Sequence, residues 1–216
     1  MMNSPTRTRD VPTRRITAAD IALMAAFAAL IIVLGAVTVP VGTLGVPVVL
    51  QNMGVALTAM VLGWKRGGLA VALFIAVGFV GVPNMAGWKP ALAAVAGPTV
   101  GYVAGYVVSA VVIGAIAQYA PRRHVARTGV FVLAGLVGIC VQYLCGSIGL
   151  VFRTGMDFTG ALVSNTPFIP GDVIKVLVAA LIASAVLRAV PDLVPARRST
   201  RSAGDIGASG TAGAAR

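Results

Sequence analysis

Six apolar stretches follow one another along the chain, separated by short segments that hold Gly, Pro and charged residues. A membrane-spanning helix needs about 20 predominantly apolar residues, and the stretches are of this order, although the second and third are short. The pattern predicts an all-α integral membrane protein, a six-transmembrane-helix bundle that forms one membrane domain over 17–190. The expected spans are 17–38, 48–64, 67–83, 97–119, 129–151 and 168–190.

The two ends of the chain lack this pattern. Residues 1–16 are polar and basic and are expected to form a cytoplasmic tail. Residues 191–216 are rich in Gly, Ala and Ser and show no apolar periodicity, so we expect a disordered tail.

The composition agrees with a membrane protein. Of the residues 58% are hydrophobic and 11% charged, and the mean hydropathy is +0.93, whereas soluble domains carry about a quarter charged residues. The net charge of +11 invites comparison with nucleic-acid-binding proteins. The basic residues flank apolar spans instead of forming one patch, however, as orientation signals do. We therefore exclude nucleic acid as a partner and expect a lipid bilayer around the chain.

All but three of the Lys and Arg residues fall on one side of the predicted membrane. Cytoplasmic loops carry an excess of positive charge, so both termini are predicted to be cytoplasmic. The exceptions are Lys89 and Arg153 in the opposite loops and Lys175 at the start of the sixth span.

The sequence holds no pattern typical of catalysis or metal binding. Cys140 and Cys145 lie five residues apart in an apolar run, so on a helix they point to different faces and are expected to be unlinked core thiols. The sole histidine, His124, lies in a basic loop, away from any nucleophile, and no phosphate-binding loop is present. We expect no catalytic residue, metal or cofactor, and a chain that is not an enzyme.

One acid and one base enter the sixth span three residues apart, in PFIPGDVIK. Ionisable residues inside a membrane are costly and indicate function by default. Asp172 is favoured by the helix dipole in a first turn, whereas Lys175 is disfavoured there. The spacing allows a local ion pair. Two interpretations stay open: a structural pair, or a ligand site that faces the outside.

Three further polar residues also allow two interpretations. Gln51 follows the uncharged segment VPVGTLGVPVVLQN, which either closes over a cavity as a lid or dips into lipid headgroups. Asn84 is either a turn residue after Pro83 or part of a site. Tyr143 is either a hydrogen-bonded helix linker or a ring stacked on a ligand.

Small residues recur at four-residue spacing in two spans, which suits close helix contacts. Gly97, Gly101 and Gly105 open the fourth span, where we expect helix packing. Ala22 and Ala26 lie in the first span and either pack within the bundle or contact another membrane protein.

In several motifs the chain resembles the BioY family, the biotin-binding S components of energy-coupling-factor (ECF) vitamin transporters. The resemblance covers roughly residues 12–190. It rests on TRRIT before an Ala-rich first span, VPVVLQNMGVALTAMVLG, GFVGVPNMAG, AGPTVGYVAGY and PFIPGDVIKVLVAAL. One departure is in the fifth span, where YLCG is followed by SIGLV and lacks the Trp expected shortly downstream.

The resemblance implies a six-helix bundle in a prokaryotic plasma membrane that captures biotin from outside. It implies as partners a membrane coupling protein and two ATPase subunits, with the subunit toppling in the bilayer to deliver biotin. The matching positions for the substrate are Gln51, Asn84, Tyr143, Asp172 and Lys175. Ala22 and Ala26 are the positions expected to face the coupling protein.

Biotin suits these residues chemically. Its ureido ring has two N–H donors and one carbonyl acceptor, which match a carboxylate and an amide. Its carboxylate needs donors, for which Lys175, Lys89, a hydroxyl or a backbone N–H serve. Two rivals stay open: a self-sufficient, proton-coupled carrier that uses Asp172 and Lys175 as a relay, and an S component for another vitamin.

Overall fold

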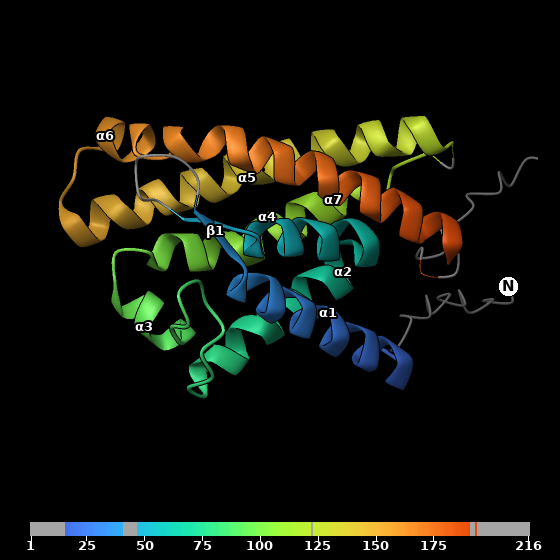
Figure 1. Cartoon of the computed structure of the whole chain (residues 1–216), viewed down its shortest axis with the longest axis horizontal. Coiled ribbons are helices and arrows are strands. Elements are labelled where there is room, and N and C mark those ends of the chain that lie inside the picture. Colours follow the sequence, from blue (N-terminus) through green and yellow to red (C-terminus); the bar gives the residue numbers. More distant parts are fainter. Residues whose placement is uncertain (1–15, 41–46, 122, 191–192, 194–216) are drawn as a thin grey trace, which may run out of the picture.

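The computed structural model describes residues 16–40, 47–121, 123–190 and 193, so most of the two predicted tails lies outside the described residues. The described chain is a bundle of long helices with short elements at one end (Figure 1). In chain order the elements are α1 (Ala18–Ala36), β1 (Thr38–Pro40), β2 (Pro47–Val49), α2 (Gln51–Phe79), α3 (Ala91–Ala96), α4 (Val100–Ala117), α5 (His124–Thr154), α6 (Phe158–Val163), the 3-10 helix η1 (Thr166–Phe168) and α7 (Ile169–Ala189).

Five helices of the described chain, α1, α2, α4, α5 and the Phe158–Ala189 segment, are long and apolar enough to cross a membrane. The second and third predicted spans fall largely in the single helix α2, which has non-helical geometry at Gly63, near the end of the second span. Gly63 has φ 74° and ψ −179°, a conformation open essentially only to glycine. A Cβ on Gly114 of α4 would collide with the backbone of Gly63 and Trp64. The break in α2 is therefore seated closely against α4.

α1 begins at a capping box. The hydroxyl of Thr17 accepts from the Asp20 amide at 3.2 Å, and the Asp20 carboxylate accepts from the Thr17 amide at 3.0 Å. This exchange satisfies two of the helix's free N–H groups. One face of α1, which includes Met24, Ala28 and Ile31, is buried. The other side, which includes Ala22 and Ala26, is exposed.

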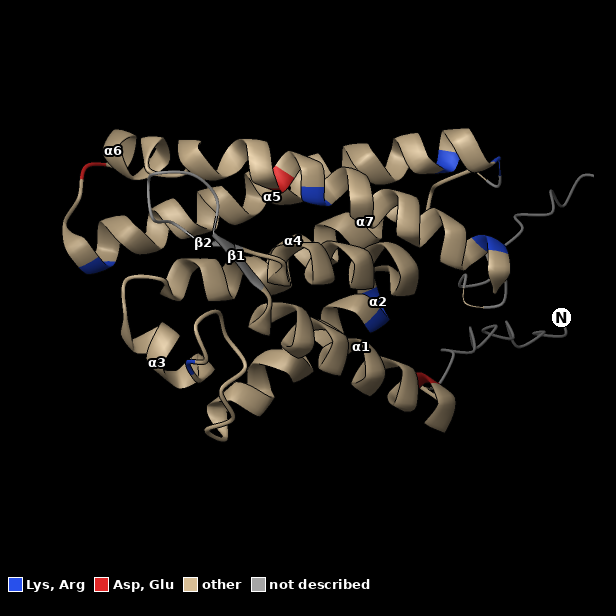
Figure 2. Cartoon of the chain, viewed as in Figure 1, with Lys and Arg blue, Asp and Glu red and all other residues tan. Residues whose placement is uncertain are grey.

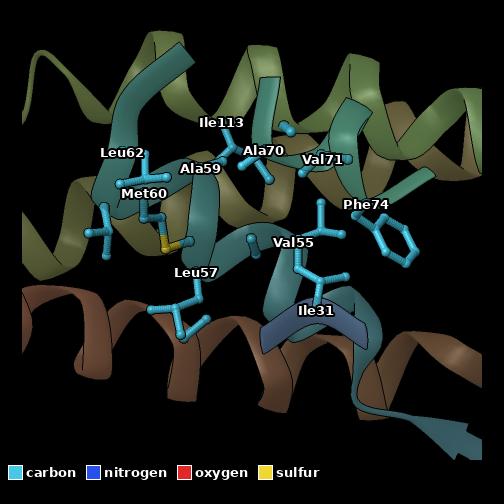
Figure 3. Packing of buried hydrophobic residues seen from close by; sticks show 14 of the residues in the cluster. Ile31, Val55, Leu57, Ala59, Met60, Leu62, Ala70, Val71, Phe74 and Ile113 are labelled. Carbon is cyan, nitrogen blue, oxygen red and sulfur yellow. The ribbon is translucent and has the colours of Figure 1, made fainter. Parts of the chain in front are cut away.

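α2 forms the centre of the bundle. Its buried residues pack with α1, α4, α5 and α7 (Figure 3). Phe74 is completely buried and meets the ring of Tyr106 on α4 edge-on, with centroids 6.3 Å apart. Such an edge-to-face arrangement is favourable for aromatic rings. α2 thus connects the other long helices through one apolar core.

Glycines let α4 and α5 approach closely. A Cβ at Gly101 would meet the backbone of Cys145 and Gly149, and one at Gly105 would meet Gln142 and Cys145. The helix packing predicted for these two glycines is confirmed. Gly97 differs, because it ends α3 and has only that helix's own carbonyls nearby. Both cysteines are free, and Cys140 is exposed instead of lying in the core as expected.

The uncharged segment after the first span includes an antiparallel hairpin, in which Thr38 pairs with Val49 and Pro40 with Pro47. The all-α prediction did not include these two strands, and the six predicted spans did not include the short helices α3 and α6. They lie at the end of the bundle opposite the start of α5 and the last turn of α7, where blue segments gather in Figure 2. We call that other end the basic end; it carries Arg123, Arg127, Arg188 and Arg66, which pairs with Asp20 in the first turn of α1. At the basic end the Thr128 hydroxyl bonds the Ser184 hydroxyl at 2.8 Å and ties α5 to α7.

Candidate functional site

A cavity of about 670 Å³ opens at the end opposite the basic end. Residues from α2, α3, α4, α5, η1 and α7 line it, together with Val49 of β2 and the segment before α3. Apolar groups such as Met85, Val103, Leu150 and Phe168 make up much of the wall. A concave, largely apolar cavity with a few convergent polar groups is the usual form of a small-molecule site.

The buried pair Asp172 and Lys175 lies in the cavity wall. The Lys175 Nζ is 2.7 Å from Asp172 Oδ1, and the Tyr143 hydroxyl donates to Asp172 Oδ2 at 2.7 Å. The exposed fractions are 3% for Asp172 and 8% for Lys175. The ammonium compensates the carboxylate, so the pair is neutral as a whole. Each carboxylate oxygen has capacity for a further bond, and the ammonium has two more N–H groups.

The side chain of Gln51 presents an acceptor. Its Nε2 donates to the Asn84 backbone carbonyl at 2.8 Å, which fixes the orientation of the amide. Its Oε1 is buried and has no hydrogen-bond partner among the described residues. Gln51 lines the cavity. Asn84 Oδ1 is a second buried side-chain oxygen without a partner among the described residues, and a buried acceptor without a partner is costly.

Asn84 lies behind Gln51 and is not among the residues that line the cavity. It is 1% exposed, and its Nδ2 donates to the Phe74 carbonyl in the last turns of α2. Its Oδ1 lies so close to Gly78 that a Cβ there would collide with it. The structure therefore brings Gln51, Tyr143, Asp172 and Lys175 to one cavity. The Asn84 side chain lies outside the cavity lining and is bonded to the last turns of α2.

Two groups of polar residues in the wall were not among the expected site residues. In the first, Asn52 Oδ1 accepts from the Tyr106 hydroxyl at 3.0 Å and from Gln142 Nε2 at 3.4 Å. All three residues line the cavity beside Asp172. Asn52 and Gln142 directly adjoin Gln51 and Tyr143 in the sequence, which was a usable signal. Tyr106 was not recognised, because the glycine spacing of the fourth span was the only pattern considered there.

The second group is centred on Asn165, just before η1. Its Oδ1 accepts from the Tyr102 hydroxyl at 2.6 Å, and its Nδ2 donates to Ser147 Oγ at 3.0 Å and to the Ala161 carbonyl at 3.0 Å. These bonds join α4, α5 and α6 around one buried amide. They hold the segment between α6 and α7 over the cavity end, and Tyr102 and Asn165 line the cavity.

Lys89 adds a cation to the cavity lining, and its side chain is exposed. Arg153 was expected in a loop but lies in the last turn of α5, and it donates to the Val95 carbonyl at 2.7 Å. No group of three His, Cys, Asp or Glu side chains that could hold a metal lies in the part of the chain that the structure describes.

Comparison with known proteins places this arrangement in a family, since the BioY family profile matches residues 6–192. The chain belongs to the BioY family. It is 38% identical over 151 residues to the biotin transporter BioY of Rhizobium etli, which covers 68% of this chain and 80% of that protein. It is also 38% identical to the biotin transporter BioY of Rhodobacter capsulatus, over 68% of this chain and 82% of that protein.

A solved structure has the same fold. The crystal structure of the S-component for biotin from an ECF-type ABC transporter matches with a TM-score of 0.69 and 27% identity. The match covers 82% of this chain and 95% of that one. The BioY resemblance inferred from the motifs is therefore confirmed, and the helical fold is that of an S component.

Proposed function

We propose that the chain takes up biotin as the membrane S component of an ECF transporter, with the cavity as its binding site. The observation that carries this proposal is the cavity wall, which brings the bonded Tyr143–Asp172–Lys175 set and the side chain of Gln51 to one space. The relatives named biotin transporters and the solved S-component for biotin support the choice of ligand.

The polar groups suit the ureido ring of biotin. The Asp172 carboxylate offers acceptors for its N–H groups, and Lys175 offers a donor for its carbonyl. The apolar wall suits the bicyclic ring system and the aliphatic chain. Cavity volumes of about 300–1,000 Å³ are usual for small-molecule sites, and the 670 Å³ here lies within that range. Lys89 is the exposed cation placed to attract the carboxylate.

We further propose six membrane spans, with both termini in the cytoplasm of a prokaryotic cell and the cavity open to the outside. The two segments of α2 on either side of Gly63 supply the second and third spans. The support is charge: the basic end carries Arg66, Arg123, Arg127 and Arg188, as expected of a cytoplasmic face.

The proposed partners are a membrane coupling protein and two ATPase subunits, because the chain has no phosphate-binding loop of its own. α1 supplies the contact surface in this proposal. Ala22 and Ala26 lie on its exposed side, away from the cavity, and their small side chains allow another helix to approach closely.

Equilibrium binding of radiolabelled biotin to the purified chain tests the ligand. Biotin is expected to bind saturably, desthiobiotin to compete through its intact ureido ring, and thiamine and riboflavin not to compete. Competition by another vitamin at lower concentration than biotin would reassign the substrate. Uptake into proteoliposomes separates the rival carrier: accumulation by the lone chain that collapses with the proton gradient would favour it, whereas dependence on ATPase partners supports the S component.

A further inference from the structure

α1 is the peripheral helix of the bundle. Of its residues 28% are buried, against 33 to 56% in the other four candidate spans. It packs chiefly on α2, and its exposed side includes Ala22, Ala25, Ala26 and Ala29. We call these four residues the alanine face. Because a single neighbouring helix holds α1, few contacts decide how it is tilted.

These contacts run along the first half of α2 in the antiparallel sense. Near the cavity end, a Cβ on Gly35 would meet the Gln51 side chain. In the middle, one on Gly54 would meet Ile31 and Leu34. Near the basic end the contact is polar: Arg66 Nη2 lies 3.0 Å from Asp20 Oδ1. The ion pair is thus a polar anchor for the part of α1 that precedes Ala22 and Ala26, beside the other interactions of Asp20.

Both members of the pair are held on rigid supports. The side-chain exposed fractions are 14% for Arg66 and 9% for Asp20, so solvent screens the pair only in part. Asp20 is fixed from its own side by the capping box with Thr17. Arg66 follows the non-helical Gly63 in α2. The backbone at Gly63 packs closely against Gly114 of α4, which holds this part of α2 in place. The ion pair therefore fixes the start of α1 relative to α2 and α4.

We propose that Arg66, through its ion pair with Asp20, is a positioning residue that fixes the tilt of α1 and so presents the alanine face to a membrane partner in one orientation. This inference rests on the proposed function insofar as that face contacts the coupling protein. Arg66 and Asp20 do not line the cavity, so the pair acts on coupling and leaves biotin binding unchanged.

Arg66→Gln is the sharpest variant, because it removes the charge and leaves the capping box of Asp20 intact. In the assembled complex with its ATPases, we expect ATP-dependent biotin uptake to fall several-fold. The biotin affinity of the lone chain should stay unchanged, and its melting temperature should fall slightly because Asp20 loses a counter-charge. Arg66→Lys keeps the charge and should restore uptake. Lys65→Gln is the matched control, since Lys65 is exposed and lies over the Trp64 ring.

The tilt of α1 can be measured without any partner. Spin labels at Ala25→Cys on α1 and Leu133→Cys on α5, in a chain whose two native cysteines are replaced by Ala, report one distance distribution. Arg66→Gln is expected to broaden or shift it, and Lys65→Gln to leave it unchanged. An unaltered distribution in Arg66→Gln overturns the positioning role.

The outcomes separate the two proposals. If Ala22→Leu and Ala26→Leu leave ATP-dependent uptake intact, the alanine face is not the coupling surface, whatever the spin labels show. If these substitutions abolish uptake while Arg66→Gln couples like the parent chain, only the positioning role fails. A loss of biotin affinity and melting temperature in Arg66→Gln assigns the pair to folding and also overturns it.

Discussion

Asp172 and Lys175 form a buried ion pair, with 2.7 Å between Nζ and Oδ1, in the first two turns of α7 at the wall of the cavity. A cation so near a helix N-terminus is disfavoured by the dipole, whereas the carboxylate is favoured. The Lys175 charge is therefore tolerated because of Asp172. The second bond to Asp172, from Tyr143, fixes the carboxylate toward the cavity. The sequence left open whether the two residues form a structural ion pair or belong to a ligand site. This geometry allows both, because the ion pair itself lies in the cavity wall.

Asp172→Asn is expected to weaken biotin binding by about 2–5 kcal/mol, because truncating one member of a buried, bonded charge pair leaves the other unpaired. The neutral amide removes the counter-charge of Lys175 and one charged acceptor for a ureido N–H. Titration calorimetry on the purified chain measures the change. Asp157→Asn is the matched control: this carboxylate is exposed and caps α6, so biotin affinity should not change. Unchanged affinity in Asp172→Asn would remove Asp172 from the site.

Gln51→Met and Asn84→Ala are expected to separate binding from support. Gln51→Met keeps the volume but removes the cavity-lining amide and its bond to the Asn84 carbonyl, so biotin binding should weaken by about 1–3 kcal/mol. Asn84→Ala removes the bond to the Phe74 carbonyl of α2, so the main loss is expected in the free energy of unfolding. Calorimetry and thermal unfolding on both variants give the comparison.

The expectation from sequence that Asn84 contacts biotin is tested by the same pair of variants. A large loss of affinity in Asn84→Ala, with the unfolding midpoint unchanged, would show direct contact with the ligand. The opposite pattern, a lower midpoint with nearly normal affinity, assigns Asn84 to holding Gln51 in place.

Much of the helical fold was predictable from sequence, because apolar runs as long as a membrane span leave few alternatives. The exception is α2. The charged pair Lys65 and Arg66 indicated a loop between two spans, whereas the backbone departs from helical geometry only at Gly63 and the helix continues through the charged residues. The conformation at Gly63 depends on close contact with α4, which is not visible in local sequence.

The site residues that are unusual within a membrane span could be predicted from the sequence. The residues that reach the cavity only because distant segments pack together could not. Asp172 and Lys175 stand out because charges are rare in apolar spans. Tyr102 and Tyr106, one turn apart on α4, are ordinary residues in a sequence. Their hydroxyls meet Asn165, just before η1, and Asn52 in α2, and all four residues line the cavity. Such contacts between distant segments have no signature in spacing.

Gly101→Ala is expected to destabilise the chain by about 1–3 kcal/mol, the usual cost of overpacking a tight interior. The added Cβ would meet the backbone of Cys145 and Gly149, and backbone has little freedom to move aside. Gly129→Ala on α5 is the matched control, since no atom lies within 4 Å of the added group. Thermal unfolding in detergent measures both. Equal unfolding midpoints in the two variants would contradict the close α4–α5 contact.

The proposed orientation predicts which ends of the bundle react from outside an intact cell. Thr159 on α6 and His124 at the start of α5 are exposed at opposite ends of the chain's long helices. Thr159→Cys is expected to react with a membrane-impermeant maleimide on intact cells, and His124→Cys only after permeabilisation, because the positive charges near His124 favour the cytoplasm.

Both variants need a background with Cys140→Ala and Cys145→Ala, since Cys140 is exposed. That background without a new cysteine is the control and should stay unlabelled. Labelling of His124→Cys on intact cells would invert the orientation and turn the cavity toward the cytoplasm, where a capture site for external biotin has no use.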